Sequence, residues 1–155
     1  MYRELVSIGL VGTTTCALYL SATAGYLLNG YKSTSEKLAK VSSTAQKDLE
    51  DTQKTVGIAL LSSIFSLSSL AYIQYRPKWT VYVSLFNTLL EVLAYRMILG
   101  YWKDNEPTKT MKKLPGMVDY TTAWSKMHML EKVIVVSGGG WCLMTMMASP
   151  NEVFK

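Results

Sequence analysis

A long uncharged apolar stretch near the start of the chain constrains the fold more than any other feature. It runs from residue 5 to residue 28 and reads LVSIGLVGTTTCALYLSATAGYLL. As a helix, it would extend roughly 36 Å at about 1.5 Å per residue. The hydrocarbon core of a bilayer is about 30 Å thick. The stretch is therefore long enough to cross a membrane.

Small residues recur at every fourth position of this stretch. They are Gly9, Thr13, Ala17, Ser21 and Gly25. On a helix they form one slowly drifting stripe. In lipid, small side chains let two helices approach closely, because packing replaces the missing hydrophobic driving force. We expect this stripe to pack against another helix.

Three further apolar stretches follow, separated by polar segments. We place the four spans at residues 5–28, 55–75, 79–101 and 128–148, and the polar segments at 32–54 and 102–126. Charged residues make up 17% of the chain, which is low for a soluble domain, and 155 residues allow one domain. The sequence therefore predicts an all-α, polytopic integral membrane protein in which residues 1–155 form a single small bundle.

The fourth apolar stretch is the least regular. Glu131 and Lys132 lie near its start, and Gly138, Gly139 and Gly140 lie in its middle. Each glycine costs a helix about 1 kcal/mol relative to alanine in water. We favour a fourth span. The alternative is three spans plus one re-entrant or interfacial segment.

The polar segment before the second span has a helical pattern. Asn29 and Gly30 predict the end of the first helix. Apolar residues from Leu38 to Val56 then follow three- and four-residue steps, without an intervening glycine or proline. We predict a helix that begins outside the membrane and continues into the second span. A solvated loop is the alternative.

The second span is rich in serine. Its residues Ala59, Ser62, Ser66 and Ser69 fall on one helical face. Hydroxyl groups in a membrane helix bond back to the preceding turn or across to a neighbouring helix. We expect this face to meet the small-residue stripe. The connection to the third span, residues 76–79, is so short that these two helices must form an antiparallel hairpin.

The third span carries Glu91 close to its midpoint, with Asn87 one turn earlier and Arg96 further along. A charge at this depth is costly, so it must face protein or water. One interpretation is a protonated structural group, hydrogen-bonded to Ser62 or Ser66 on the neighbouring helix. Another is an ion pair with Arg96 or a second subunit, although a separation of five residues places Arg96 on a different helix face. The third interpretation is a proton or cation site.

No catalytic motif stands out. The sequence lacks HExxH, CxxC and a phosphate-binding glycine loop, and it offers no Ser-His-Asp set. Cys16 and Cys142 are interpreted as buried thiols, and His128 has no neighbours with ligand spacing. We therefore expect no catalytic residue, metal or cofactor, and we do not expect an enzyme.

The distribution of charge bears on partners and topology. The net charge of +5 includes ten lysines in the segments 32–54 and 102–126. No basic stripe with interleaved aromatic residues indicates nucleic-acid binding. The positive-inside rule places both segments on the cytoplasmic or equivalent side. The expected partners are the lipid bilayer and other protein subunits.

These observations lead to two hypotheses of different class. The first is a non-enzymatic accessory subunit that anchors or scaffolds a larger membrane assembly. Its host would be a respiratory or ATP-synthase complex of the mitochondrial inner membrane, or the internal membrane of a virion and its capsid. The alternative is a small proton or cation transporter or channel that uses Glu91.

Overall fold

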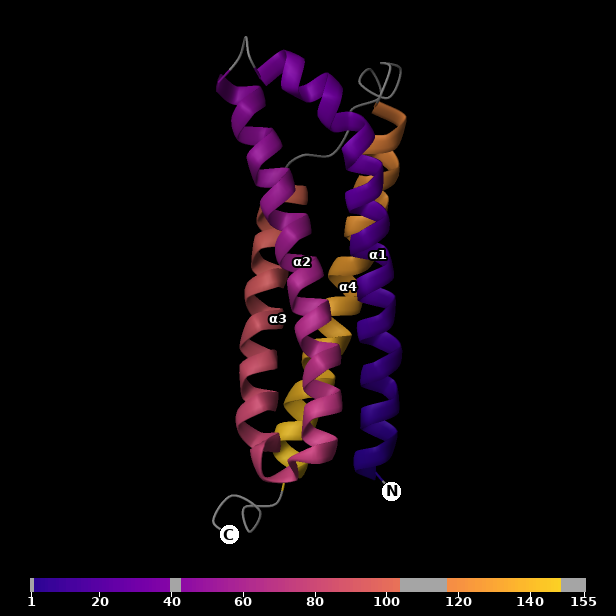
Figure 1. Ribbon diagram of the computed structural model, residues 1–155, viewed down its shortest axis with the longest axis vertical. Coiled ribbons are helices and arrows are strands. Elements are labelled where there is room, and N and C mark those ends of the chain that lie inside the picture. Colours follow the sequence, from indigo (N-terminus) through magenta and orange to yellow (C-terminus); the bar gives the residue numbers. More distant parts are fainter. Residues whose placement is uncertain (1, 40–42, 104–116, 149–155) are drawn as a thin grey trace.

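Four long helices make up the fold. The computed structural model describes residues 2–39, 43–103 and 117–148. The helices are α1 (Tyr2–Ala39), α2 (Ser43–Tyr75), α3 (Thr80–Trp102) and α4 (Met117–Met147), and a single 3₁₀ turn, η1 (Pro77–Trp79), joins α2 to α3. Figure 1 shows the helices side by side, with the start of α1 and the end of α4 at the same end as η1.

Each helix packs against two others. The helix α1 contacts α2 and α4, and α3 contacts the same two helices from the opposite corner. Because the chain reverses direction between successive helices, all four of these packed pairs are antiparallel (Figure 1). The arrangement is an up-down-up-down four-helix bundle.

The buried positions follow a seven-residue repeat. On α1 the buried residues are Leu10, Thr14, Ala17, Leu20, Ser21, Ala24 and Leu28; on α3 they are Thr80, Ser84, Asn87, Glu91, Ala94, Ile98 and Trp102. Alternating steps of three and four residues give a period near 3.5, which is typical of left-handed helix packing. The repeat extends through α4, from Tyr120 to Met144.

The bundle carries apolar residues outside and many polar residues inside. Exposed side chains include Ile8, Leu61, Leu89, Val136 and Met146. Fully enclosed polar side chains include Thr14, Ser21, Ser66, Asn87 and Ser137. This distribution is the reverse of that in a soluble protein. Helices satisfy their own backbone hydrogen bonds, so such a bundle suits a hydrocarbon environment.

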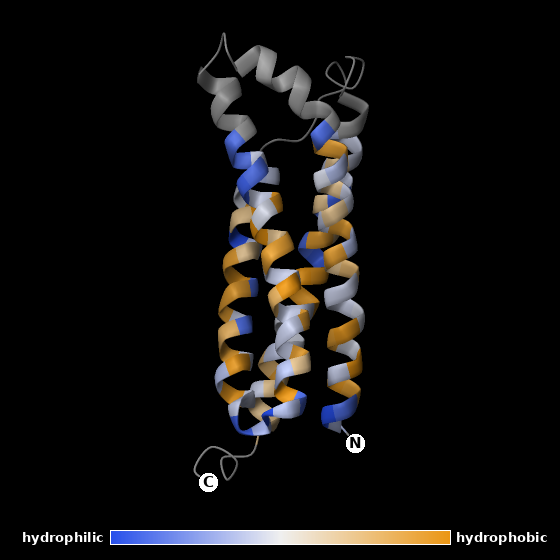
Figure 2. Cartoon of the chain, in the orientation of Figure 1, coloured by the Kyte–Doolittle hydropathy of each residue, from blue (hydrophilic) through white to orange (hydrophobic). Residues whose placement is uncertain are grey.

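All four helices are long and apolar enough to cross a membrane. The qualifying segments are Tyr2–Asn29, Glu50–Tyr75, Pro77–Trp102 and Tyr120–Met147. Figure 2 shows apolar residues along all four helices and hydrophilic residues towards the ends of the bundle. The predicted all-helical, four-helix architecture is confirmed, and it supports a multi-pass membrane protein. The fourth apolar stretch forms one continuous helix through Gly138, Gly139 and Gly140.

Two helix boundaries differ from those predicted. The first helix does not end at Asn29 and Gly30 but continues to Ala39, so this prediction was wrong. A single glycine weakens a helix without breaking it, and Glu36 to Ala39 are good helix formers. The fourth helix begins at Met117, so part of the polar segment 102–126 is helical. The rest of that connection, residues 104–116, lies outside the described residues.

Hydrogen bonds donated by side chains join the helices at both ends of the bundle. At one end, Trp102 Nε1 donates to Thr55 Oγ1 at 3.0 Å, and Trp124 Nε1 donates to the Trp102 carbonyl at 3.0 Å. At the η1 end, Arg3 Nη2 donates to Thr80 Oγ1 at 2.8 Å. These contacts join α2 to α3, α3 to α4 and α1 to α3. They fix the register of the helices that position the central residues.

Candidate functional site

The middle of the bundle holds a carboxyl group. Glu91 lies on the inward face of α3, and its side chain is 3% exposed. Asn87 precedes it by one helical turn on the same face, and Ser84 precedes Asn87. Because inward positions recur every three or four residues, all three polar side chains point towards the other helices.

Two neighbouring helices donate hydrogen bonds to Glu91. Ser66 Oγ of α2 donates to Glu91 Oε1 at 3.0 Å, and Ser137 Oγ of α4 donates to the same oxygen at 3.2 Å. The carboxyl group thus joins three helices at one point. Ser66 Oγ also lies 3.1 Å from Asn87 Oδ1. A hydroxyl has one hydrogen, so Ser66 donates to one of these oxygens at a time.

Asn87 is held by its own helix. Its Nδ2 donates to the Val83 carbonyl at 2.8 Å, which leaves Oδ1 facing Ser66. Ser62, the other expected neighbour of Glu91, instead bonds back to the Ala59 carbonyl at 3.1 Å. The structure therefore brings Asn87, Glu91 and Ser66 together, and Ser62 lies one turn away from this group.

Some buried polar atoms of this region have no partner among the described residues. They are Glu91 Oε2, Ser84 Oγ and Trp141 Nε1. Leaving a buried donor or acceptor unpaired costs about 1–3 kcal/mol. Such groups are uncommon in folded proteins. The hydrogen-bonding capacity of the buried polar groups in this region is thus not fully used by the described residues.

Apolar side chains enclose Glu91 from both directions along the bundle. Beyond it, towards the end of α3, a cluster includes Ala94, Ile98, Leu130 and Ile134. Towards η1, a second cluster consists of Leu10, Leu70, Ile73, Trp141 and Met144. The polar residues around Glu91 lie between these two clusters.

Two further predictions concern Arg96 on α3 and the serine-rich face of α2. Arg96 is exposed on the outward face of α3 and does not appear among the hydrogen-bond partners of Glu91. The serine-rich face of α2 is buried throughout, at Ala59, Ser62, Ser66 and Ser69.

The small-residue stripe of α1 is only partly buried. Ala17 and Ser21 are buried, Thr13 and Gly25 are half-buried, and Gly9 is exposed. At Gly25, an added Cβ would lie 3.3 Å from Val56 Cγ1, so α1 and α2 approach closely there. The stripe contacts its neighbours at its centre and turns outward at its start.

Sequence reasoning missed Ser137. A signal was available, because Ser66, Glu91 and Ser137 each lie near the midpoint of their own predicted span. In an antiparallel bundle the midpoints of all spans lie at the same depth. Polar residues at those midpoints are therefore the ones that can meet.

Neither the thiols nor the histidine are hydrogen-bond partners of Glu91 among the described residues. Cys16 is exposed and Cys142 half-buried, so the expectation of two buried thiols was wrong for Cys16. His128 Nδ1 lies 3.1 Å from Glu131 Oε2, and its ring stacks on Trp124. Among the residues placed by the structure, no three potential metal ligands gather.

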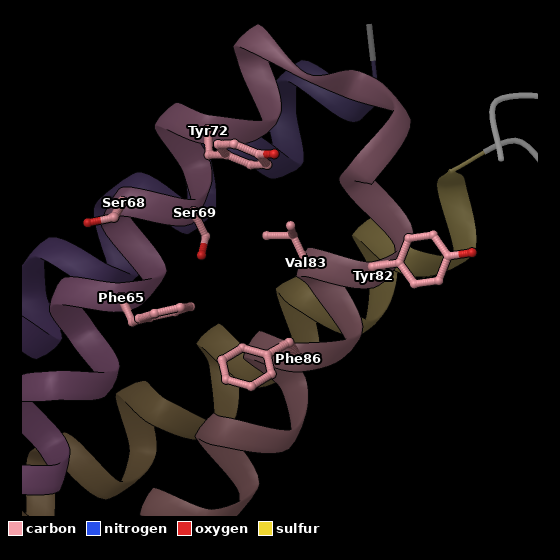
Figure 3. A pocket seen from close by; sticks show the side chains of 7 residues that line it. All are labelled: Phe65, Ser68, Ser69, Tyr72, Tyr82, Val83 and Phe86. Atoms are coloured by element: carbon pink, nitrogen blue, oxygen red, sulfur yellow. The ribbon is translucent and has the colours of Figure 1, made fainter. Parts of the chain in front are cut away.

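A separate groove lies between α2 and α3 near η1. It measures about 510 Å³, and aromatic side chains line it, including Phe65, Tyr72, Tyr82 and Phe86 (Figure 3). The ring centroids of Phe65 on α2 and Phe86 on α3 lie 5.2 Å apart. Its lining holds hydroxyl groups but no charged side chain. It is therefore distinct from the site at Glu91.

Comparison with protein families, curated proteins and solved structures gives no match. The function must accordingly be argued from the geometry of the bundle itself.

Proposed function

We propose that the chain is a non-enzymatic, multi-pass membrane subunit that anchors or scaffolds a larger assembly. The observation that carries this proposal is the enclosure of the central polar group between two apolar clusters. A bundle filled in this way holds its helices in register, and it offers its outer surface and its end segments to partners.

The hydrogen bonds of Glu91 support a structural role. One oxygen accepts from Ser66 and Ser137, so a single side chain ties α3 to both of its neighbours. Polar contacts of this kind hold membrane helices together where lipid supplies no hydrophobic drive. Apolar clusters lie on either side of this polar group along the bundle.

The ends of the bundle differ in charge, which supports a fixed orientation. Arg3, Arg76 and Lys78 lie at the η1 end, whereas the ten lysines belong to the segments at the other end. By the positive-inside rule, the lysine-rich end faces the cytoplasmic or equivalent side. We propose that this end contacts lipid head groups and the partner subunits. The proposed location is the mitochondrial inner membrane or the internal membrane of a virion.

Purification from the native membrane tests the proposal. A tagged chain would be extracted in a mild detergent and its companions quantified by mass spectrometry. We expect other subunits in a fixed molar ratio that persists through a second purification step. An unrelated tagged multi-pass protein from the same membrane serves as the control. Recovery of the chain alone, or only with copies of itself, would contradict a scaffolding role.

The alternative is a small proton or cation transporter or channel, and one observation favours it. Glu91 Oε2 is buried and has no partner in the described part of the chain. Intramembrane carboxyl groups with spare hydrogen-bonding capacity mark ion and proton pathways in other proteins. The test is proton or cation flux into vesicles containing the purified chain. Flux that is lost in Glu91→Gln, with folding unchanged, would replace the scaffold proposal with this one.

A further inference from the structure

The aromatic groove between α2 and α3 has the size of a binding site for a small amphiphile. Its volume of about 510 Å³ lies within the usual range for small-molecule pockets, about 300–1,000 Å³. On α2 it runs from Phe65 to Tyr72, a separation of seven residues, or about 10 Å along the helix axis. Phe65, Tyr72, Tyr82 and Phe86 are each close to half exposed. The groove is therefore open on the outer surface, which faces lipid if the bundle spans the bilayer.

One hydroxyl group inside the groove is available to a ligand. Ser69 lines the groove and is 5% exposed, and Figure 3 shows its oxygen directed into the space between α2 and α3. The neighbouring Ser68 donates to the Ile64 carbonyl of its own helix at 2.9 Å. Ser69 makes no such bond among the residues that the structure describes. Because buried hydroxyl groups usually have a partner, this one can donate to an acceptor that a ligand brings.

Two cations lie just beyond the groove, on the turn that joins its two walls. Arg76 follows Tyr72 by one helical turn, and its backbone N–H donates to the Tyr72 carbonyl at 3.0 Å. Lys78 precedes Tyr82 by four residues. Both cations are exposed, and within the described part of the chain neither forms an ion pair. The rings of Trp79 and Tyr82, with centroids 5.9 Å apart, are exposed at the same end. Exposed tryptophan and tyrosine side chains favour the head-group level of a bilayer.

We propose that this groove binds one anionic phospholipid. The phosphate lies against Arg76 and Lys78, an acyl chain lies along the aromatic side chains, and an ester carbonyl of the lipid accepts a hydrogen bond from Ser69. Cations beside a bilayer attract anionic lipids, and arginine binds phosphate oxygens in pairs. A zwitterionic lipid would bring a cation of its own close to Arg76 and Lys78. This site is additional to the proposed scaffolding function and does not depend on it.

Competition between two lipids tests the charge of the ligand. The purified protein is placed in micelles with equal amounts of dioleoyl phosphatidylglycerol, which is anionic, and dioleoyl phosphatidylcholine, which is zwitterionic. Native mass spectrometry then counts the lipids retained by each chain. We expect one retained phosphatidylglycerol, with at least a fivefold preference over phosphatidylcholine. Equal retention of the two lipids would overturn the proposal.

Two matched double variants locate the charge effect. Arg76→Gln/Lys78→Gln should reduce the preference for phosphatidylglycerol to less than twofold. Arg96→Gln/Lys103→Gln removes the same charge from exposed positions nearer the other end of α3, and it should leave the preference unchanged. An equal loss in both double variants would show an effect of net charge alone and would contradict a site at this groove.

A larger side chain tests whether the acyl chain occupies the groove. Figure 3 shows Val83 directed into the groove, so Val83→Phe fills part of it. Val136→Phe makes the same change at an exposed position of α4 and serves as the control. With helix content unchanged by circular dichroism, we expect Val83→Phe to lower retention of phosphatidylglycerol at least fivefold and Val136→Phe to leave it unchanged. Normal retention by Val83→Phe would mean that the lipid does not lie in the groove.

The contact with Ser69 is tested without filling the groove. The dialkyl ether analogue of phosphatidylglycerol lacks the ester carbonyl but keeps the charge and both chains. We expect the original chain to retain the ester lipid at least twofold better than the ether lipid, and Ser69→Ala to abolish this difference. Equal retention of ester and ether lipids by the original chain would show that the assigned contact, and with it this placement of the lipid, is wrong.

A photoreactive side chain identifies the occupant in the native membrane. On illumination, the side chain introduced by Phe86→p-benzoylphenylalanine inserts into a nearby C–H bond, so the adduct keeps the whole mass of its partner. We expect phospholipid adducts enriched in anionic lipids, compared with those formed by Val136→p-benzoylphenylalanine on α4. An adduct with a polypeptide would show that a partner helix or a second copy of the chain covers the groove, and it would overturn the proposal.

Discussion

At the scale of single residues, Glu91 determines how the middle of the bundle is held together. A serine in its place could not reach both neighbours, whereas the longer carboxyl side chain meets Ser66 and Ser137 at one oxygen. These two hydrogen bonds require a particular alignment of the helices, whereas the apolar contacts on either side of Glu91 along the bundle do not. A single polar layer of this kind selects one register among the many that apolar helices could adopt.

Substitution of Glu91 separates its possible roles. Glutamine keeps the shape and the accepting oxygen but cannot ionise, so we expect Glu91→Gln to unfold at nearly the same denaturant concentration as the original chain. Leucine removes the acceptor from both serines, and we expect Glu91→Leu to lower the free energy of unfolding by roughly 1–2 kcal/mol. The measurement is unfolding in mixed micelles, followed by circular dichroism.

A loss of stability in Glu91→Gln would indicate that Glu91 is part of an ion pair. If Glu91 were paired with a buried cation of another subunit, Glu91→Gln would destabilise the assembly as well, because the cation would be left unpaired. Asn87→Leu provides a matched comparison. Asn87 lies on the same face of α3 and shares Ser66, but its hydrogen bonds reach only α2 and its own helix.

Much of this residue-scale arrangement could be predicted from the sequence. A carboxyl at the middle of an apolar span must face inward, and Asn87 and Ser66 follow from helical spacing and from the short α2–α3 hairpin. Ser137 lies near the midpoint of the predicted fourth span, so the same reasoning about depth could have included it. That Glu91 Oε2 has no partner among the described residues depends on side-chain positions, which residue spacing alone does not predict.

At the scale of helices, the difference between a four-residue and a seven-residue repeat decides which face of α1 is buried. A four-residue step on a helix with about 100° per residue drifts by about 40° at each step. The stripe from Gly9 to Gly25 therefore crosses the interface instead of following it. Alternating steps of three and four keep Leu10, Thr14 and Ala17 on the inner side. Small residues alone did not identify this face, because Leu10 and Leu20 also belong to it.

The contact between α1 and α4 depends on one glycine. An added Cβ at Gly140 would lie 2.8 Å from Leu10 Cδ2 and 3.1 Å from Leu10 Cγ, and Leu10 is fully buried. We expect Gly140→Ala to lower the free energy of unfolding by about 1–3 kcal/mol, the usual cost of overpacking. The neighbouring Gly139→Ala should be neutral or slightly stabilising, since its Cβ meets open space and alanine favours the helix.

A second substitution checks the cause of this effect. Leu10→Ala removes the two side-chain atoms that Gly140→Ala would strike. The double variant should therefore be more stable than the sum of the two single changes predicts, as measured by a double-mutant cycle. Strict additivity would show that the cost of Gly140→Ala does not arise from contact with Leu10.

At the scale of the whole molecule, the hydropathy of the sequence was sufficient to predict the architecture. Four apolar stretches joined by short or moderate connections can form an up-down bundle with few alternatives, because each span must reverse direction. What hydropathy could not supply is the order of neighbours around the bundle. Apolar residues lie on the outer as well as the inner faces of the helices, so the buried polar residues are the clearest mark of the inward face.

The topology of the whole chain gives the last prediction. If all four helices cross the membrane, Glu50 and Lys103 lie on one side, and Lys78 lies on the other. Single cysteines at these positions, in a Cys16→Ala/Cys142→Ala background, would be treated with an impermeant maleimide on sealed vesicles of known orientation. All three positions are exposed. We expect positions 50 and 103 to react from the cytoplasmic or equivalent side and position 78 from the opposite side, since the lysine-rich segments are retained where they are made. Reaction of positions 103 and 78 from the same side would mean that α3 does not cross the bilayer, and Glu91 would then no longer lie at its midplane.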